Sequence, residues 1–226
     1  MGADQPGDFE IYLLAQTWAP QFCCTQADKC TTVPWAFSAR HFSLHGLWPG
    51  YATPRTAGST FPESCRVKAQ LLTSQLPREY IDLAPAFTKW NAAEHRPELG
   101  GLARHEWHKH GTCSGLSPEG YFAEALRAMQ ALPGDRGTPA IVSDNVGGAV
   151  SAAALRAAYP KQVAVRTNKH CVLSELTSCW EKRADGRVGA LIDCPQHVMR
   201  GRDTDCATVR ITELGKCFRK AGKKGR

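Results

Sequence analysis

Residues 105–110 decide how this chain is interpreted, and they read His105-Glu106-Trp107-His108-Lys109-His110. Successive helical residues are about 100° apart, which places His105, Lys109, Glu106 and His110 at about 0°, 40°, 100° and 140°. Trp107 and His108 then point to the opposite side, and Gly111 follows where a helix commonly ends. One helical face therefore carries two imidazoles, a carboxylate and an ammonium group. These groups exchange protons near neutral pH beside a fixed positive charge, so the pattern predicts chemistry on an anion.

Other uses of this histidine cluster fit less well. A zinc protease helix requires a second histidine four residues after the first, and Lys109 occupies that position. A zinc site built from His45, His108 and His110 is an alternative, but Lys109 would repel the ion. Ser114 lacks the flanking glycines of a serine hydrolase. We therefore expect no metal ion and no other cofactor. The isolated histidines are expected to be structural, and they are His41, His95, His170 and His197.

Length and composition predict one soluble domain. The chain has 226 residues, of which 42% are hydrophobic. None of its apolar runs approaches the length of about 20 residues that crosses a bilayer. A chain of this size buries a substantial core, so a second domain and a membrane anchor are not expected.

The cysteines predict an oxidising compartment. Their number is even and they are widely scattered, which is typical of disulfides rather than of a metal site. The first residues lack the basic and apolar regions of a secretory signal. We therefore expect a mature secreted or periplasmic protein whose leader has been removed. The ten cysteines are Cys23, Cys24, Cys30, Cys65, Cys113, Cys171, Cys179, Cys194, Cys206 and Cys217.

The net charge of +7 comes almost entirely from the last eleven residues, which hold six basic side chains and no acid. The rest of the chain is therefore nearly neutral. A terminal run of glycine and lysine is typical of a solvated tail, and we expect residues 216–226 to be disordered, as well as residues 1–8 at the other end. Neither segment is assigned a function.

The residue patterns predict an α+β fold. Apolar and mixed residues alternate over 9–16, which indicates a strand, and residues 49–62 are rich in loop-forming types. Helices are expected over 66–76, 79–90, 117–129, where Ser117 is the N-cap, and 151–159. Further strands are expected over 162–167, 171–180, 187–193 and 208–212. We expect a central, mostly antiparallel sheet with helices packed on it.

Two segments resemble the active-site motifs of the ribonuclease T2 family. They are residues 42–49, FSLHGLWP, and residues 105–113, HEWHKHGTC, in that order and about 60 residues apart. Residues 16–23, 61–65 and 192–195 also resemble family segments. The similarity spans roughly residues 9–206, so we expect residues 9–215 to form a ribonuclease T2-like catalytic domain. The resemblance implies a disulfide-stabilised, metal-independent endoribonuclease that cuts single-stranded RNA through a 2′,3′-cyclic phosphate with low base specificity.

The resemblance also implies the residue roles. RNA transesterification removes a proton from the 2′-oxygen, passes through a phosphorane with extra negative charge, and protonates the departing 5′-oxygen. By the family pattern His110 is the general base and His45 the general acid, and the two exchange roles when the cyclic phosphate is hydrolysed to a 3′-phosphate. Lys109 and Glu106 stabilise the phosphorane, and His105 binds the phosphate. Glu106 is also expected to keep a neighbouring imidazole protonated, and its alternative is a surface carboxylate paired with His110.

Base recognition is less well matched to the family. Trp48 corresponds to a tryptophan that stacks on the base 5′ of the cut, and a core position is its alternative. Where some relatives carry an acid that contacts adenine, this chain has Gly50 followed by Tyr51. Leu102 stands where many relatives place an aromatic residue for the 3′-side base. We therefore expect Trp48, Tyr51 and Leu102 to contact the bases with little discrimination.

The resemblance suggests four disulfides, which join Cys23 to Cys30, Cys65 to Cys113, Cys179 to Cys194, and Cys171 to Cys206. Cys24 and Cys217 are then left over, and their pairing is a hypothesis reached by elimination. The expected partner is single-stranded RNA, with no membrane, no obligate protein partner and a monomeric state. Two alternatives to the enzyme are a non-catalytic RNA-binding or signalling protein on the same fold and a metal-dependent phosphodiesterase.

Overall fold

The fold is described from a computed structural model, which describes residues 4–55, 58–66, 70–84, 90–91, 96–97 and 101–218. It confirms the predicted α+β class with an antiparallel central sheet. The strands of this sheet are β1 (Ile11–Thr17), β2 (Ser43–Gly50), β6 (Ala164–Thr167), β7 (Leu173–Lys182) and β8 (Val188–Ile192). Their order is β2-β1-β7-β6, and β8 also pairs with β7.

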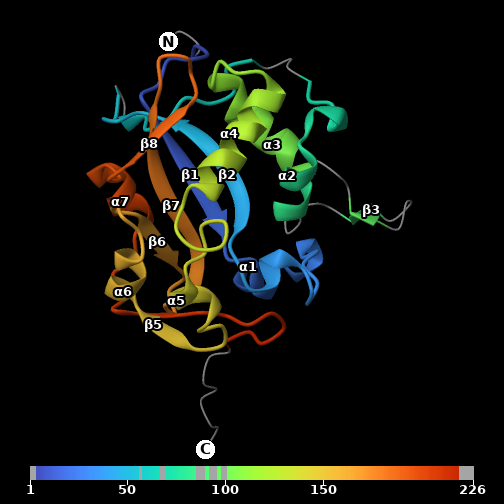
Figure 1. Cartoon of the computed structure of the whole chain (residues 1–226), viewed down its shortest axis with the longest axis vertical. Helices are drawn as coiled ribbons and strands as arrows, with labels where there is room; N and C mark the ends of the chain where they lie inside the picture. Colours follow the sequence, from blue (N-terminus) through green and yellow to red (C-terminus); the bar gives the residue numbers. More distant parts are fainter. Residues whose placement is uncertain are drawn as a thin grey trace, which may run out of the picture.

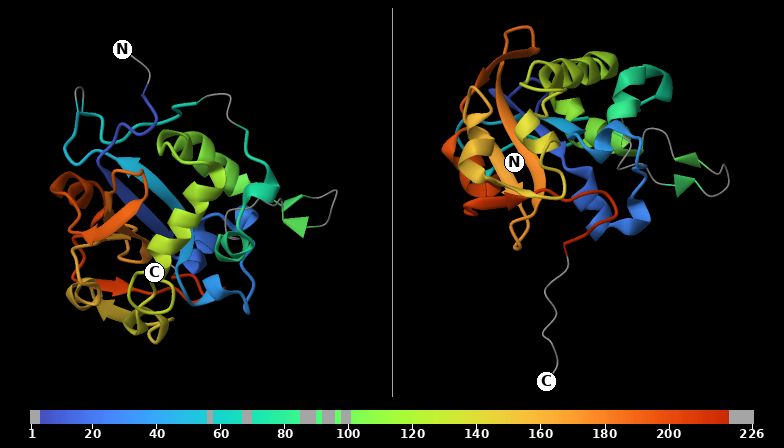
Figure 2. Two further views of the ribbon diagram at one scale, coloured as in Figure 1. Left: turned by 45° about the horizontal axis from the view of Figure 1, so that its top comes forward. Right: turned by 60° about the horizontal axis from the view of Figure 1, so that its bottom comes forward.

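Helices cover the sheet unevenly. Figure 1 shows α2 (Arg78–Leu83), α3 (Gly101–Lys109) and α4 (Pro118–Gln130) grouped beside β2 and β1, while α6 (Ala152–Ala157) and α7 (Gln196–Arg202) lie beside β6. The turned views of Figure 2 show the same grouping. The remaining elements are α1 (Ala19–Thr25), α5 (Ala140–Ser143), the pair β3 (Trp90–Asn91) and β4 (Arg96–Pro97), and the pair β5 (Ala149–Ser151) and β9 (Thr208–Arg210).

Both faces of β1 are buried, because each packs in a different core. Tyr12 and Leu14 belong to the main core with the aromatic residues of α4, whereas Leu13 belongs to a smaller core that includes Val198 of α7. The Tyr121 hydroxyl of α4 donates a 2.6 Å hydrogen bond to the Leu47 carbonyl of β2. α4 is thereby fixed against the strand that carries the first motif.

Several predicted elements are confirmed with small boundary changes. Ser117 caps α4 and accepts from the Gly120 amide, and Ser151 caps α6 in the same way through the Ala154 amide. The predicted strands after residue 160 all form within two residues of their expected starts. Strand β2 was not predicted, because its sequence contains two glycines and a proline.

Two predicted helices are wrong in the described residues. The segment expected over 66–76 contains only a 3-10 turn, Thr73–Gln75, and its residues 67–69 lie outside the described residues. The helix expected over 79–90 is the shorter α2, which ends at Leu83, and Trp90 begins β3. His95 and residues 85–89 also lie outside the described residues.

The described residues near both ends of the chain contact the folded body. Residues 4–8 are bound to the folded body, because the Gly7 amide donates to the Cys113 carbonyl and Asp8 pairs with Arg55. Cys217 is held by a disulfide to Cys24. The disorder expected over 1–8 and 216–226 stays a prediction. Residues 1–3 and 219–226 lie outside the described residues.

Four disulfides pair as the resemblance implies, and the fifth joins the two cysteines that were left over. They are Cys23–Cys30, Cys24–Cys217, Cys65–Cys113, Cys171–Cys206 and Cys179–Cys194. Cross-links of this kind stabilise a fold chiefly by constraining the unfolded chain.

Candidate active site

His45 projects from a β-bulge in β2. Opposite β1, Ala15 pairs with Gly46 and Gln16 pairs with Leu44, so His45 is the extra residue. A bulge redirects a side chain and shifts the alternation of the strand. Leu44 and Leu47, three residues apart, consequently both face the main core. His45 is left at the edge of the smaller core, 25% exposed.

Two carboxylates flank the His45 ring. Its Nδ1 atom lies 3.2 Å from Glu175 Oε2 on β7, within hydrogen-bond distance, and its Nε2 atom lies 3.6 Å from Glu106 Oε1 on α3. Burial lowers the pKa of His45, but the hydrogen bond to Glu175 and the attraction of both carboxylates outweigh it. The pKa of His45 is therefore raised, and the ring holds its proton more strongly than an ordinary histidine.

Glu106 is buried where α3 approaches β2 closely. Its Oε2 atom accepts a 2.7 Å hydrogen bond from Trp48 Nε1. A side-chain carbon at Gly46 would lie 2.0 Å from the same oxygen, so only glycine allows this approach. Burial raises the pKa of Glu106 to about 7. The alternative of a surface carboxylate paired with His110 is wrong, and Glu106 is neutral over much of the acidic range.

His110 directly follows α3, and its amide closes the last helical turn by donating to the Glu106 carbonyl. Burial, followed by repulsion from Lys109, His105, His45 and Arg202, lowers the pKa of His110 to about 3. The ring is therefore neutral and able to accept a proton. Gly111 begins a 3-10 turn rather than a left-handed helix cap, and its missing side chain makes room for Trp107, whose ring would lie 2.3 Å from an added carbon.

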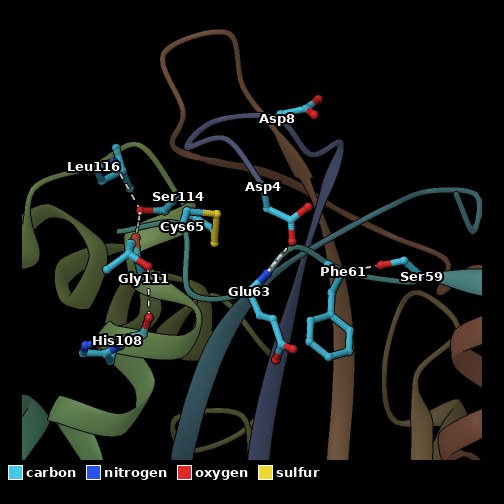
Figure 3. Close-up of a disulfide and its surroundings, with 12 residues drawn as sticks. Asp4, Asp8, Ser59, Phe61, Glu63, Cys65, His108, Gly111, Ser114 and Leu116 are labelled. Carbon is cyan, nitrogen blue, oxygen red and sulfur yellow. Dashed lines mark hydrogen bonds between the residues drawn. A yellow bond between two sulfur atoms is a disulfide. The ribbon is translucent and has the colours of Figure 1, made fainter. Parts of the chain in front are cut away.

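A loop between β2 and α3 completes this side of the site. Figure 3 shows Phe61 and Glu63 on the loop that Cys65 ties to Cys113, while Asp4 accepts a hydrogen bond from the Glu63 amide. Lys109 Nζ lies 3.7 Å from Glu63 Oε2 and 5.6 Å from the centre of the Phe61 ring. The disulfide therefore holds the loop at the end of α3.

These groups line one cleft of about 510 Å³. The Trp48 ring lies between the two imidazoles, with its centre 5.2 Å from each ring centre. The opposite wall comes from β6 and α7 and carries two guanidinium groups and a further histidine. The lining residues are Leu13, His45, Trp48, Pro49, Thr60, Phe61, His105, Glu106, Lys109, His110, Arg166, His197, Val198, Gly201 and Arg202.

The structure brings together most of the predicted site residues. All four members of the predicted helical face line the cleft, while Trp107 packs in the main core and His108 is exposed. Burial and the neighbouring Lys109 and His45 lower the pKa of His105. Trp48 also lines the cleft, but it is 8% exposed and the Arg202 guanidinium lies 4.6 Å from its ring centre. Trp48 is thus both a core residue and part of the cleft wall.

Two predicted base contacts are not at the cleft. Tyr51 is buried in the main core beneath Arg55, whose guanidinium lies 3.8 Å from the ring centre. Leu102 is buried in the same core and does not line the cleft. Their contact with the bases stays a prediction, which their burial does not support.

The sequence missed the residues that the second wall contributes. Glu175 and Arg202 lie in no sequence motif. They reach His45 only because β7 pairs with β1 and because α7 packs close by. His197, expected to be structural, lines the cleft. A charged residue in the interior of a predicted strand was the available signal for Glu175.

A metal-binding cluster and a membrane-spanning helix are both absent from the described residues. Within them, no group of three or more His, Cys, Asp or Glu side chains is arranged to hold a metal ion. None of the helices in the described part of the chain is long and apolar enough to cross a membrane.

The chain is similar to known ribonucleases. A model of the Ribonuclease T2 family matches residues 9–194. Ribonuclease I of Escherichia coli is 29% identical over 184 residues, which cover 70% of this chain and 67% of that protein. Intracellular ribonuclease LX of Solanum lycopersicum is 33% identical over 121 residues, covering 53% and 47%, and a ribonuclease of Aeromonas hydrophila is 32% identical over 135 residues, covering 58% and 50%. The match spans about half the length of the last two.

Solved structures share the fold. Ribonuclease MC1 from the seeds of bitter gourd superposes with a TM-score of 0.59 at 23% identity, over 90% of this chain and 100% of that chain. A mutant of that protein in complex with 5′-GMP gives the same values. An RNase-related protein from Calystegia sepium gives a TM-score of 0.61 at 18% identity, over 90% of this chain and 97% of that chain.

Proposed function

The chain belongs to the ribonuclease T2 family, and we propose on that premise that it is an endoribonuclease that cleaves single-stranded RNA without a metal ion. Cleavage produces 2′,3′-cyclic phosphate ends, which are then hydrolysed to 3′-phosphates. The complexes of ribonuclease MC1 variants with 5′-GMP and 5′-UMP support RNA as the substrate class.

One observation carries the proposal, namely that two histidines line one cleft, and that His45 lies beside two carboxylates whereas His110 is buried next to Lys109. Burial and nearby cations lower the pKa of His110 to about 3, whereas the pKa of His45 is raised by the two carboxylates beside it despite its burial. Paired titratable groups whose environments separate their pKa values are typical of an acid and a base. At mildly acidic pH, His110 is neutral and His45 is protonated.

This charge distribution supports the proton transfers of RNA cleavage. His110 takes the proton from the 2′-hydroxyl as the 2′-oxygen forms a bond to phosphorus. His45 gives a proton to the 5′-oxygen as the bond between phosphorus and that oxygen breaks. In the second step, His45 removes a proton from water as the water oxygen forms a bond to phosphorus, and His110 returns a proton to the 2′-oxygen as the bond between phosphorus and that oxygen breaks. Both rings end in their starting states, so no cofactor is consumed.

Lys109, Glu106 and His105 stabilise the phosphorane and bind the phosphate. Lys109 brings a fixed positive charge to the cleft. Because burial raises the pKa of Glu106 to about 7, its carboxyl group is largely neutral in mild acid and can donate a hydrogen bond to a phosphoryl oxygen. An ionised carboxylate would repel that oxygen, so the burial of Glu106 suits the role.

The base contacts and the location are further parts of the proposal. Trp48 and the half-buried Phe61 are the aromatic side chains of the cleft wall, and either ring offers a surface on which any base stacks, which supports low base specificity. Five disulfides support an oxidising compartment, so the protein is proposed to be secreted or periplasmic. We propose that it acts as a monomer.

The test is cleavage of a short RNA in EDTA, with products separated and identified by mass. Intact protein is expected to give cyclic phosphate ends, and a DNA strand of the same sequence stays uncut because it lacks the 2′-hydroxyl. His45→Ala and His110→Ala are each expected to lose at least 10²-fold in rate, the usual contribution of a general acid or base.

Other outcomes select the alternatives. RNA binding without cleavage by the intact protein would indicate a non-catalytic RNA-binding protein. Cleavage that EDTA abolishes and a divalent ion restores would indicate a metal-dependent phosphodiesterase. Full activity in either histidine variant would reject the assigned roles.

A further inference from the structure

We propose that Glu175 is a positioning residue for His45, that it acts as the ionised counterion of this imidazole, and that Arg202 holds it in place. The role in catalysis rests on the proposed ribonuclease function, whereas the interaction of the three side chains does not. Glu175 comes from β7, Arg202 from α7 and His45 from β2, so the assembly joins three elements far apart in the sequence.

The geometry uses both oxygens of the Glu175 carboxylate. Oε2 lies 3.2 Å from His45 Nδ1, and Oε1 accepts a 2.9 Å hydrogen bond from Arg202 Nη1. Arg166 on β6 reaches the same Oε1 atom at 3.9 Å. Glu175 is 7% exposed, and a buried carboxylate is tolerated when cations and hydrogen bonds compensate it. Two guanidinium groups and an imidazolium provide that compensation, and the pKa of Glu175 is lowered despite its burial.

The two carboxylates beside His45 therefore have different tasks. Glu106 accepts a hydrogen bond from Trp48 and is largely neutral in mild acid, because burial raises its pKa to about 7. Glu175 stays charged in the same range. The expectation that Glu106 keeps the imidazole protonated thus applies mainly to Glu175. Glu106 remains free to act on the phosphate.

These side chains contact one another in a closed circle around the site. Arg202 holds Glu175 with one nitrogen while its guanidinium carbon lies 4.6 Å from the centre of the Trp48 ring. Trp48 donates to Glu106 Oε2, and Glu106 Oε1 lies 3.6 Å from His45 Nε2. Each member is fixed by two others, which restricts the imidazole to one orientation.

The orientation of the His45 imidazole decides which of its nitrogens transfers the proton. When His45 Nδ1–H donates to Glu175, the transferable proton is on Nε2. After Nε2–H protonates the leaving 5′-oxygen, the neutral ring keeps its proton on Nδ1, and Nε2 is ready to accept one from water in the second step. The carboxylate of Glu175 does not itself take a proton in this scheme.

The test compares Glu175→Gln and Arg202→Gln with a control, Glu181→Gln. Glu181 lies exposed on the same strand, away from the cleft. NMR titration measures the pKa of the His45 ring in each variant, and dinucleotide cleavage gives kcat and KM against pH. The charged groups that face His45 are Glu175 on β7, Arg202 on α7, and Glu106, His105 and His110 at the end of α3. Glu175→Gln changes the charge at one position, whereas Arg202→Gln also removes the hydrogen bond to Glu175.

The two variants are expected to shift the His45 pKa in opposite directions. Glu175→Gln removes the counterion and lowers the pKa, whereas Arg202→Gln removes a repelling cation and raises it. In Glu175→Gln the alkaline limb of kcat moves to lower pH, and kcat falls about 10- to 100-fold with little change in KM, as for other residues that orient a functional imidazole. Glu181→Gln leaves both quantities unchanged.

Unchanged His45 pKa values in both variants, or shifts in the same direction, would overturn the proposal. If Glu175 and Arg202 had a purely structural role, both variants would be less stable, but the His45 pKa would not fall in one variant and rise in the other. If Glu175→Gln does not fold, the sign of the shift in Arg202→Gln decides. Failure of the intact protein to cleave RNA would reject the proposed function, and the titration would still test the interaction.

Discussion

Replacing Gly46 with alanine tests the close approach of α3 to β2. The added methyl carbon would lie 2.0 Å from Glu106 Oε2, 2.6 Å from Trp48 Nε1 and 2.7 Å from Glu106 Cδ. Ordinary contact begins at about 3.4 Å, so the carboxylate must withdraw by more than 1 Å. That movement breaks the 2.7 Å hydrogen bond from Trp48 and takes Glu106 away from His45.

The expected size of the effect follows from this displacement. Overfilling a packed site costs about 1–3 kcal/mol of stability. A misplacement of about 1 Å in catalytic groups reduces the rate on the order of 10²-fold. Gly46→Ala should therefore fold, with a lower melting temperature, and lose about 100-fold in kcat/KM for RNA cleavage.

Gly201→Ala is the matched control, because Gly201 lines the same cleft and an added carbon there meets no atom within 4 Å. This variant should keep its activity and gain slight stability, since alanine is favoured over glycine in a helix. Thermal unfolding and dinucleotide cleavage are measured for both variants. If Gly46→Ala keeps an activity within a few-fold of the intact protein, cleavage does not depend on the close approach of α3 to β2 at Gly46.

Three further predictions concern the surroundings of the site. Replacing Cys65 and Cys113 with alanine opens a cross-link of 48 residues, which should cost about 4 kcal/mol in chemical unfolding and reduce kcat/KM by loosening the adjacent loop. The pKa of Glu106 is about 7 in the folded chain and 4.5 ordinarily, so between these values the folded chain keeps a proton that the unfolded chain releases, and the folded state loses stability as pH rises through that interval. Glu106→Gln does not titrate, so its melting temperature should rise relative to that of the intact protein between pH 5 and pH 8. The same difference in melting temperature at pH 5 and at pH 8 would contradict the burial of an ionisable Glu106. Leu102→Ala should lose about 2–5 kcal/mol in unfolding yet keep the same dinucleotide preference, whereas a changed preference would restore its predicted role in base binding.

The sequence predicted those parts of the site that are local in the chain. His105, Glu106, Lys109 and His110 lie within one helical turn and a half, so the helical period alone placed them on one face. The N-cap at Ser117 was predictable for the same reason, because it depends on residues three apart.

The remaining parts depend on tertiary contacts. Glu175 and Arg202 meet only because β7 pairs with β1 and α7 packs on the smaller core. Strand β2 and its bulge at His45 were missed, since glycine and proline disfavour a strand and the bulge needs its neighbour to be defined. Tyr51 was assigned by its place after the motif, but its ring turns into the main core.

The most direct test of the central claim is measurement of the pKa values of His45 and His110 by NMR in the intact protein. We expect a pKa for His110 far below the ordinary 6.5, near 3, and a pKa for His45 above 6.5. Equal values, or a higher pKa for His110 than for His45, would contradict the assignment of base and acid on which the proposed mechanism depends.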